Sequence, residues 1–270
     1  MFQQKKETFF FESQFGITPQ INGSQFTVTL SEPIAVPRNA QEVTVKIHSA
    51  EIWNTFPNIE NGVNNVFYFE GLKNNVLQPF MITVPEGAYN VAGLNIVLQN
   101  QFSLYEVDDD FVTLEEFVEQ GKVVMVMKNI GTIYRPLLST ISKVIGFTQE
   151  KTSISAGERF VADEIAQFNR VNKLFLQSTL LSVGIPYNGA PSKILAKIPI
   201  SAVPGSQFNF QPFDAIEVYA DSLRGSQMST ITFWLTDEQG RYVNTGGESW
   251  GFAMILSYKE LPNYQLRSML

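Results

Sequence analysis

The chain has 270 residues, of which 44% are hydrophobic, so it can bury a substantial core in one large or two small domains. Its formal net charge is -7 and no block of lysine or arginine occurs, which argues against direct binding to nucleic acid. The lack of cysteine excludes disulfides, thiolate metal sites and a cysteine nucleophile, while a charged content of only 17% favours a surface packed against neighbouring subunits.

The first 22 residues show no targeting signal. No apolar run in the chain approaches the length of a membrane-spanning helix, and MFQQKKETFFFE has no signal-peptide core, so we expect synthesis in the cytosol and no membrane span. Residues 1–22 are polar and rich in phenylalanine, and we interpret them as an N-terminal arm. The arm is either disordered in the isolated chain or orders against a neighbouring subunit, with Phe9, Phe10 and Phe11 in pockets there.

Residues 23–75 carry three expected strands. Their ranges are Gln25–Leu30, Glu42–Trp53 and Asn64–Glu70. In the second strand the apolar positions change face after Ile47, which predicts a β-bulge near His48–Ser49. We assign this region to the first part of a β-sandwich.

Residues 76–164 change to an α/β pattern. Strands are expected over Phe80–Val84 and Lys122–Lys128, and a second helix over 136–146, starting at Pro136. The first helix is capped by Asn90 and has an apolar stripe at helical spacing: Val91, Leu94, Leu98 and Phe102. This segment is predicted to be a small inserted α/β subdomain.

Residues 165–260 return to short strands with period-2 alternation. Five strands are expected, over Lys173–Leu181, Lys193–Ile200, Ala215–Ala220, Thr230–Thr236 and Trp250–Tyr258. Together with the three earlier strands they make eight, the number of an antiparallel jelly-roll sandwich, and residues 261–270 follow as a C-terminal tail.

The residues that could carry chemistry are sparse. His48 is the single histidine, and no G-x-S-x-G elbow accompanies it, so a surface or bulge position is the favoured interpretation. Asp108, Asp109 and Asp110 lack the spacing of a calcium loop and are interpreted as a solvated loop. The run from Asp237 to Gly240 is typical of a hairpin turn.

A carbohydrate-active site would need two carboxylates close in space, and Glu51, Glu70 and Glu217 on strands are the candidates. Nothing in the sequence selects a pair. Exposed aromatic residues such as Trp53, Phe56 and Trp250 could stack on sugars or bases, although core packing is the commoner role on strands. We therefore assign no catalytic, cofactor-binding or metal-binding residue.

Several motifs occur in an order that is similar to one family. The segment VPRNA leads into EVTVKIHSAEIWNTFPNI and NNVFYFE, and ITVPEGAYNVAGLNIVLQNQF then gives a strand, a turn and a helix that carries Leu94 and Asn95. A helix ending Ile145-Gly146-Phe147 and a closing hairpin TITFWLTDEQGRYVNTGGESWGFAMILSY follow. In this order the motifs resemble the penton and minor capsid proteins of virophages and polinton-like viruses.

The resemblance implies a single jelly-roll capsid protein with an outward-facing insertion, five copies of which close each icosahedral vertex. We expect a virion location after assembly inside the host cell and contact with the major capsid protein, with a host receptor as a candidate partner of the insertion. The candidate subunit-interface residues are aromatic: Phe9, Phe10, Phe11, Trp53 and Phe56. The alternatives are a receptor-binding spike, a major single jelly-roll capsid protein and, less favoured, the carbohydrate-active enzyme.

Overall fold

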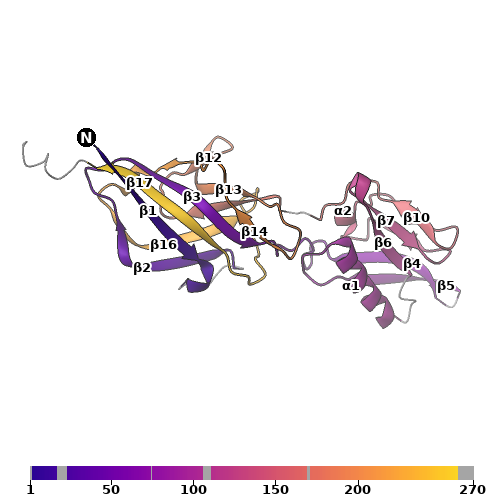
Figure 1. The fold of residues 1–270 in the computed structure, drawn as a ribbon. Helices are drawn as coiled ribbons and strands as arrows, with labels where there is room; N and C mark the ends of the chain where they lie inside the picture. The colour runs from indigo at the N-terminus through magenta and orange to yellow at the C-terminus, as the bar shows by residue number, and fades with distance from the viewer. Residues whose placement is uncertain (1, 17–22, 74, 106–110, 169–170, 261–270) are drawn as a thin grey trace, which may run out of the picture. The chain divides into compact units, whose positions relative to one another are not determined.

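The polypeptide forms two units, one of which is inserted into the other (Figure 1). A computed structural model describes residues 2–16, 23–73, 75–105, 111–168 and 171–260. The first unit comprises Met1–Thr55 and Val171–Leu270, and the second comprises Phe56–Arg170. The boundaries differ from the expected 76–164, because the strand predicted over Asn64–Glu70 belongs to the inserted unit.

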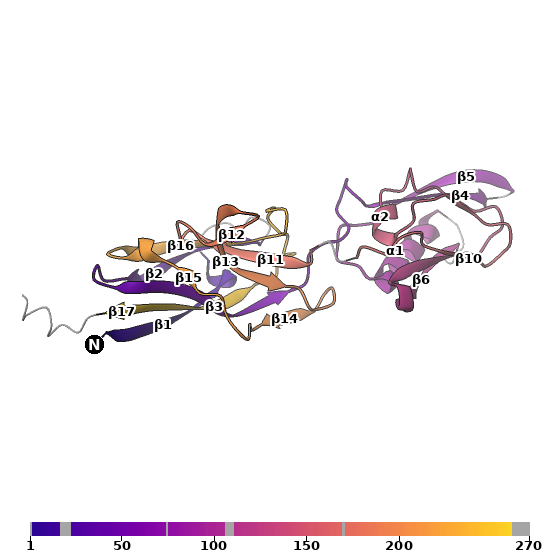
Figure 2. The same cartoon turned by 90° about the horizontal axis from the view of Figure 1, so that it is seen from above.

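The first unit is a sandwich of two antiparallel sheets, which Figure 2 shows as separate layers. The strands of the first sheet, in spatial order, are β1 (Gln3–Glu12), β17 (Gly251–Glu260), β3 (Gln41–Trp53) and β14 (Gln207–Phe210), with β15 (Val218–Tyr219) also paired to β3. Those of the second sheet are β12 (Ile185–Tyr187), β13 (Ala190–Pro199), β11 (Lys173–Ser178), β16 (Gln227–Thr236) and β2 (Gln25–Ala35). Short 3-10 turns cover Ser13–Phe15 (η1) and Asp221–Leu223 (η3).

The strand order of the two sheets is that of a jelly roll. β14 and β15 pair with the same side of β3 and act as one interrupted strand, while β12 is an additional hairpin arm on β13. The eight remaining strands, numbered along the chain, then lie in the orders 1-8-3-6 and 5-4-7-2. Each sheet thus alternates strands from the two ends of the chain, as two interleaved Greek keys require. The predicted fold class is confirmed.

The membership of the eight strands differs from the prediction at two places. The N-terminal arm is no separate tail, since residues 3–12 form β1, which pairs along its whole length with β17. The strand was not predicted because its three consecutive phenylalanines break the alternation of apolar and polar residues. The strand expected over Asn64–Glu70 is β4 (Val66–Lys73), which pairs with strands of the inserted unit. Alternation identifies a strand but not the sheet that it joins.

Aromatic side chains fill the space between the two sheets. Phe11 of β1 lies with its ring centroid 4.7 Å from that of Phe233 on β16 and 5.4 Å from that of Phe252 on β17. Phe26 of β2 completes the group through Phe233 at 5.6 Å and Trp250 at 4.9 Å. Because these rings come from both sheets, the aromatic cluster joins the first strand of the chain to the core.

The predicted bulge in β3 is confirmed. Ala253 of β17 pairs with Ser49 and Met254 pairs with Ile47, so His48 has no partner in the ladder. His48 is exposed at this bulge. The extra residue moves Ala50 and Ile52 onto the same buried face as Ile47, which keeps the inner side of the strand apolar.

The inserted unit contains two small antiparallel sheets and one main helix. The strands of one sheet, in spatial order, are β5 (Val76–Thr83), β4, β8 (Ile133–Tyr134) and β9 (Lys151–Thr152). Those of the other are β10 (Glu158–Val161), β7 (Lys122–Met127) and β6 (Val112–Phe117). The helical elements are α1 (Val91–Leu104), α2 (Ser142–Ile145) and the 3-10 turn η2 (Val118–Gln120). A single apolar core unites them, in which Phe69 lies 5.0 Å from Phe80 and 5.2 Å from Phe111 between ring centroids.

The first predicted helix is confirmed in detail. Its buried residues are the expected stripe of Val91, Leu94, Leu98 and Phe102, and the side chain of Asn90 accepts a hydrogen bond from the amide of Gly93 at 2.8 Å. Asn95 lies on the same helix and pairs with both backbone groups of Leu114, accepting from its amide at 2.7 Å. The Leu-Asn motif therefore joins the helix to β6.

The second predicted helix is shorter than expected. α2 begins at Ser142 instead of Pro136, and Leu137, expected on its apolar side, is almost fully exposed. The preceding residues form a turn because Ser139 and Ile141 bond to the edge of β4: Tyr68 donates its amide to the Ser139 hydroxyl at 2.8 Å, and Ile141 donates its own to Val66 at 3.1 Å.

Candidate functional site

The outer face of the first sheet contains a groove with aromatic ends. It has a volume of about 280 Å³ and crosses β1, β17 and β3, and we call it the aromatic groove. The residues that define it here are Phe10, Glu12, Glu51, Trp53, Gly251 and Ala253.

The register of the sheet places these side chains together. Phe10 pairs with Ala253, which pairs with Ser49, and two residues further on Glu12 pairs with Gly251, which pairs with Glu51. Residues two apart on a strand share a face, so both rows point outward. Small residues on the central strand form the floor, and larger side chains on the flanking strands form the walls.

Phe10 and Trp53, two of the predicted interface residues, are thus brought to one site. The Phe10 side chain is 77% exposed, and Trp53 is half-buried. An exposed phenylalanine forgoes roughly 2 kcal/mol of stabilisation that burial would supply. Such residues mark surfaces that become covered by a partner.

The other predicted interface residues lie elsewhere. Phe11 is 4% exposed because its ring packs between the sheets, and Phe56 is 6% exposed. Neither is a surface residue of the chain, so their side chains are unavailable for contact with a neighbour. Phe9 is half-buried and lies beside Phe11, with ring centroids 6.3 Å apart.

A second apolar surface lies on the opposite edge of the same sheet, and sequence reasoning missed it. The β14–β15 strip consists of Phe213, which is fully exposed, Ile216 at 60% and Tyr219 at 74% exposure. The strip lies on β15 and on the segment that connects β14 to β15, which runs along the side of β3 that faces away from β17. The sequence did contain a signal for this surface, because Phe213 lies between Pro212 and Asp214, outside any alternating run that would bury it.

The three candidate carboxylates of an enzyme site have separate surroundings. Glu70, in the inserted unit, accepts two hydrogen bonds from the Arg135 guanidinium, at 2.7 and 3.0 Å, which lower the pKa of this carboxyl. Glu217 pairs with Lys46 at 3.1 Å. Glu51 is exposed in the aromatic groove. Two of the three are therefore held in ion pairs.

The remaining candidates have structural roles or lie outside the described residues. Asp237 accepts hydrogen bonds from the amides of Gln239 and Arg241, at 2.8 and 2.9 Å, within the predicted hairpin turn. Trp250 is buried and donates its indole N–H to the carbonyl of Gly23 at 2.9 Å. Asp108, Asp109 and Asp110 lie outside the described residues, as does the tail 261–270.

Among the described residues, no group of three or more histidine or acidic side chains is arranged to hold a metal ion. None of the helices that the structure describes combines the length and apolarity needed to cross a membrane.

The fold defines a single jelly roll with a separate unit inserted between its third and fourth strands. No protein-family model matches the chain, and no curated protein matches its sequence. Among solved structures, the crystal structure of the mavirus penton protein is similar, with a TM-score of 0.51 and 8% sequence identity, over 94% of this chain and 99% of that one. The resemblance to penton proteins predicted from the motif order is confirmed at the level of the fold.

Proposed function

We propose that this chain is a capsid structural protein and that five copies form the capsomer at each vertex of an icosahedral virion. The similarity to the mavirus penton protein supports this role, because it extends over almost the whole of both chains and includes the inserted unit. In this proposal the protein has no catalytic function. Its partners are the other copies in the ring and the major capsid protein, and it assembles inside the host cell.

The observation that carries the proposal is the presence of two different apolar surfaces on opposite edges of one sheet. A closed ring needs a heterologous contact, in which one surface of a subunit meets a different surface of its neighbour. The aromatic groove lies beside the edge formed by β1, and the β14–β15 strip follows the other edge. Phe10 and Phe213 are the most exposed aromatic residues of the two surfaces.

Mass photometry of the purified chain over a range of concentrations tests this proposal. A pentamer is expected, and Phe213→Ser should weaken its formation without unfolding the monomer. Leu137→Ser is a matched control, because this equally exposed residue lies in the inserted unit. A persistent monomer, even beside the major capsid protein, would contradict the proposal. In a virion reconstruction, density at the five-fold axes would distinguish the vertex role from that of a major single jelly-roll capsid protein.

The inserted unit supports a second role, in attachment to a host receptor. Leu72 and Leu77 pair across the β4–β5 hairpin, and both are exposed. Ile130 is also exposed and precedes Gly131, where an added Cβ would contact the side chain of Leu72. Apolar residues from two separate turns thus lie close together at one end of this unit. Binding of the full chain to host cells should fall with Ile130→Asp and remain with Val203→Asp, which lies in the jelly roll.

A further inference from the structure

We propose that the aromatic groove binds residues 261–270 of a neighbouring copy of this chain, with Arg267 beside the carboxylates of Glu12 and Glu51. The inference rests on the proposed assembly into rings and names a contact that holds the ring together.

The groove is suited to a ligand that is both apolar and positively charged. Phe10 and Trp53 lie toward its two ends, about 13 Å apart along the strand direction, because Phe10 is level with Ser49 and Trp53 is four residue steps further along β3. The carboxylates of Glu12 and Glu51 flank Gly251 between these ends. Among the described residues that line the groove, none is a lysine, arginine or histidine.

Glu51 is available to such a ligand. In the part of the chain that the structure describes, its carboxylate makes no hydrogen bond or ion pair, whereas Glu12 accepts a hydrogen bond from the Gln14 side chain. A carboxylate beside an exposed aromatic ring attracts a guanidinium, which pairs with the oxygens and stacks on the ring.

The segment LPNYQLRSML has the complementary composition. It contains one arginine, Arg267, and no acidic residue, and its larger side chains are apolar or aromatic: Tyr264, Leu266 and Met269. In an extended peptide, Arg267 and Met269 share a face and lie roughly 7 Å apart, which is the spacing of Glu51 and Trp53 on β3. With Arg267 opposite the two carboxylates, Met269 therefore reaches an aromatic end of the groove.

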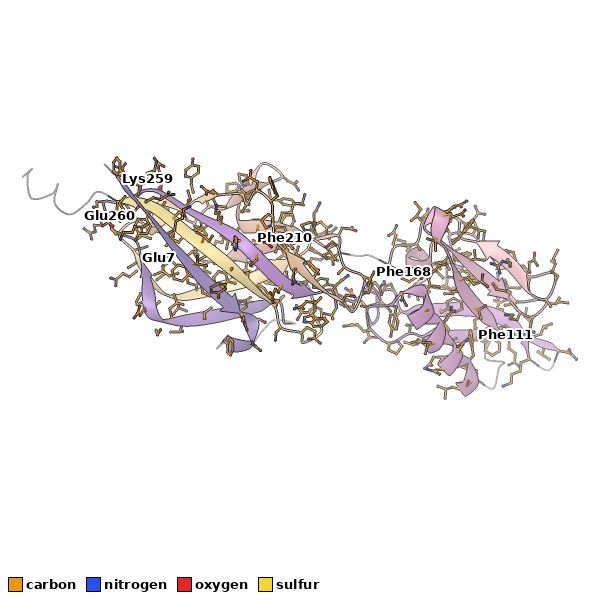
Figure 3. All side chains as sticks on the ribbon, in the orientation of Figure 1. Glu7, Phe111, Phe168, Phe210, Lys259 and Glu260 are labelled. Carbon is orange, nitrogen blue, oxygen red and sulfur yellow. The ribbon has the colours of Figure 1, made fainter. Side chains whose placement is uncertain are left out.

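The donor is a neighbouring copy and not the same chain. β17 starts at Gly251, in the floor of the groove, and ends at Glu260, beside Lys259 and on the ladder opposite Gln3 (Figure 3). The nine residue steps between them span about 30 Å, whereas Arg267 follows Glu260 by seven steps, which reach at most about 25 Å. Arg267 of the same chain therefore falls short of the carboxylates beside Gly251.

A labelled peptide with the sequence of residues 261–270 tests the site on the full-length chain. The acceptor carries Arg267→Glu, so that its own segment does not compete. Fluorescence anisotropy should show saturable binding, weakened about tenfold by adding Glu51→Lys to the acceptor. The matched control is Glu32→Lys, an exposed glutamate of the other sheet, which should leave affinity unchanged.

A charge swap gives the sharper result. A peptide carrying Arg267→Glu should fail to bind the original groove and regain binding to an acceptor that carries Glu51→Lys and keeps its own Arg267, which does not compete for the reversed charge. Equal binding with and without Glu51→Lys, or no saturable binding at all, would overturn the assignment. Circular dichroism of each acceptor checks that the fold is retained.

The origin of the segment is tested in a mixture of isotopically light and heavy full-length chains that carry a photo-crosslinking residue at Leu266. Mixed-isotope crosslinks to the strands of the groove are expected, and crosslinks within one isotope alone would overturn the contact between copies. Native mass spectrometry separates this inference from the proposed function. Pentamers that persist while the peptide does not bind refute only the tail contact, whereas peptide binding by a chain that never forms rings contradicts the proposed function.

Discussion

Asn58 and Phe168 lie 110 positions apart in the sequence and meet at one hydrogen bond. The side-chain amide of Asn58 donates to the carbonyl oxygen of Phe168 (Figure 3) at 2.8 Å. The same amide donates to the carbonyl of Tyr89 at 2.6 Å, and its oxygen accepts from the Tyr89 amide at 2.9 Å. One buried side chain thus joins the first and last parts of the inserted unit to its middle.

Replacing this side chain should destabilise the inserted unit. Asn58→Ala leaves the Tyr89 amide and two partly buried carbonyl groups without their partner, at a cost of about 2–4 kcal/mol. Urea unfolding followed by circular dichroism measures the loss. Asn61→Ala is the control, because Asn61 is exposed, and it should cost less than about 1 kcal/mol. Equal losses in the two variants would contradict the role assigned to Asn58.

Adjacent residues of β1 should respond in opposite ways. Phe11→Ala removes a ring from the core between the sheets and should lower the free energy of unfolding by about 3–5 kcal/mol. Phe10→Ala should change it by less than about 0.5 kcal/mol while weakening self-association. Thermal unfolding and mass photometry of both variants provide the measurements. A larger loss of stability for Phe10→Ala would mean that β1 is assigned to the wrong register.

Acidification should destabilise the inserted unit through Asp163. Burial by itself would raise the pKa of this carboxyl, but hydrogen bonds from Lys151 and from the amides of Gln149 and Thr148 outweigh burial and lower the pKa. The folded state therefore holds the proton more weakly than the unfolded state. The stabilisation is complete above about pH 4 and is lost as the pH falls through the lowered pKa.

Comparison with Asp163→Asn isolates this effect. At pH 7 the variant should be less stable by on the order of 2 kcal/mol, and the difference should shrink as the pH falls below about 4. Urea unfolding at a series of pH values measures it. A difference that stays constant over this range would show that the ionised carboxylate is not the source of the stabilisation.

Alanine substitutions at two glycines of the inserted unit allow the cost of backbone strain to be distinguished from that of a steric clash. Both Gly146 and Gly157 have positive φ, of 79° and 76°, so alanine is strained at either position by roughly 1–2 kcal/mol. A Cβ at Gly146 would lie 2.4 Å from the carbonyl oxygen of Glu164, whereas at Gly157 it would meet nothing within 4 Å. Gly146→Ala should therefore lower the melting temperature clearly more than Gly157→Ala, and equal shifts would contradict the contact.

The inserted unit should fold by itself when it is cut at the observed boundaries. A fragment of residues 56–170 retains β4 and Asn58, and should show a cooperative thermal transition. A fragment of residues 76–164, cut at the boundaries expected from sequence, lacks β4, the strand between β5 and β8. It should therefore fail to fold, and proton NMR spectra of the two fragments distinguish the outcomes. Folding of the shorter fragment would show that β4 is dispensable.

The aromatic groove shows how far sequence reasoning reaches toward a site. Phe10 and Trp53 were candidates because exposed aromatic residues are enriched at interfaces, but no sequence pattern places them at one groove. That proximity depends on the register of β1, β17 and β3, which joins residues more than 200 positions apart. The same register removes Phe11 from the surface, and the alternation of neighbouring residues on a strand explains the difference.

What the sequence determined by itself is local. The stripe and cap of α1, the bulge at His48 and the turn at Asp237 all follow from spacings of a few residues, and each is confirmed. The tertiary structure alone decided that β1 belongs to the jelly roll and that β4 does not. Strand pairing over long distances depends on which apolar faces can be buried together, and period-2 alternation is the same in every half-buried strand.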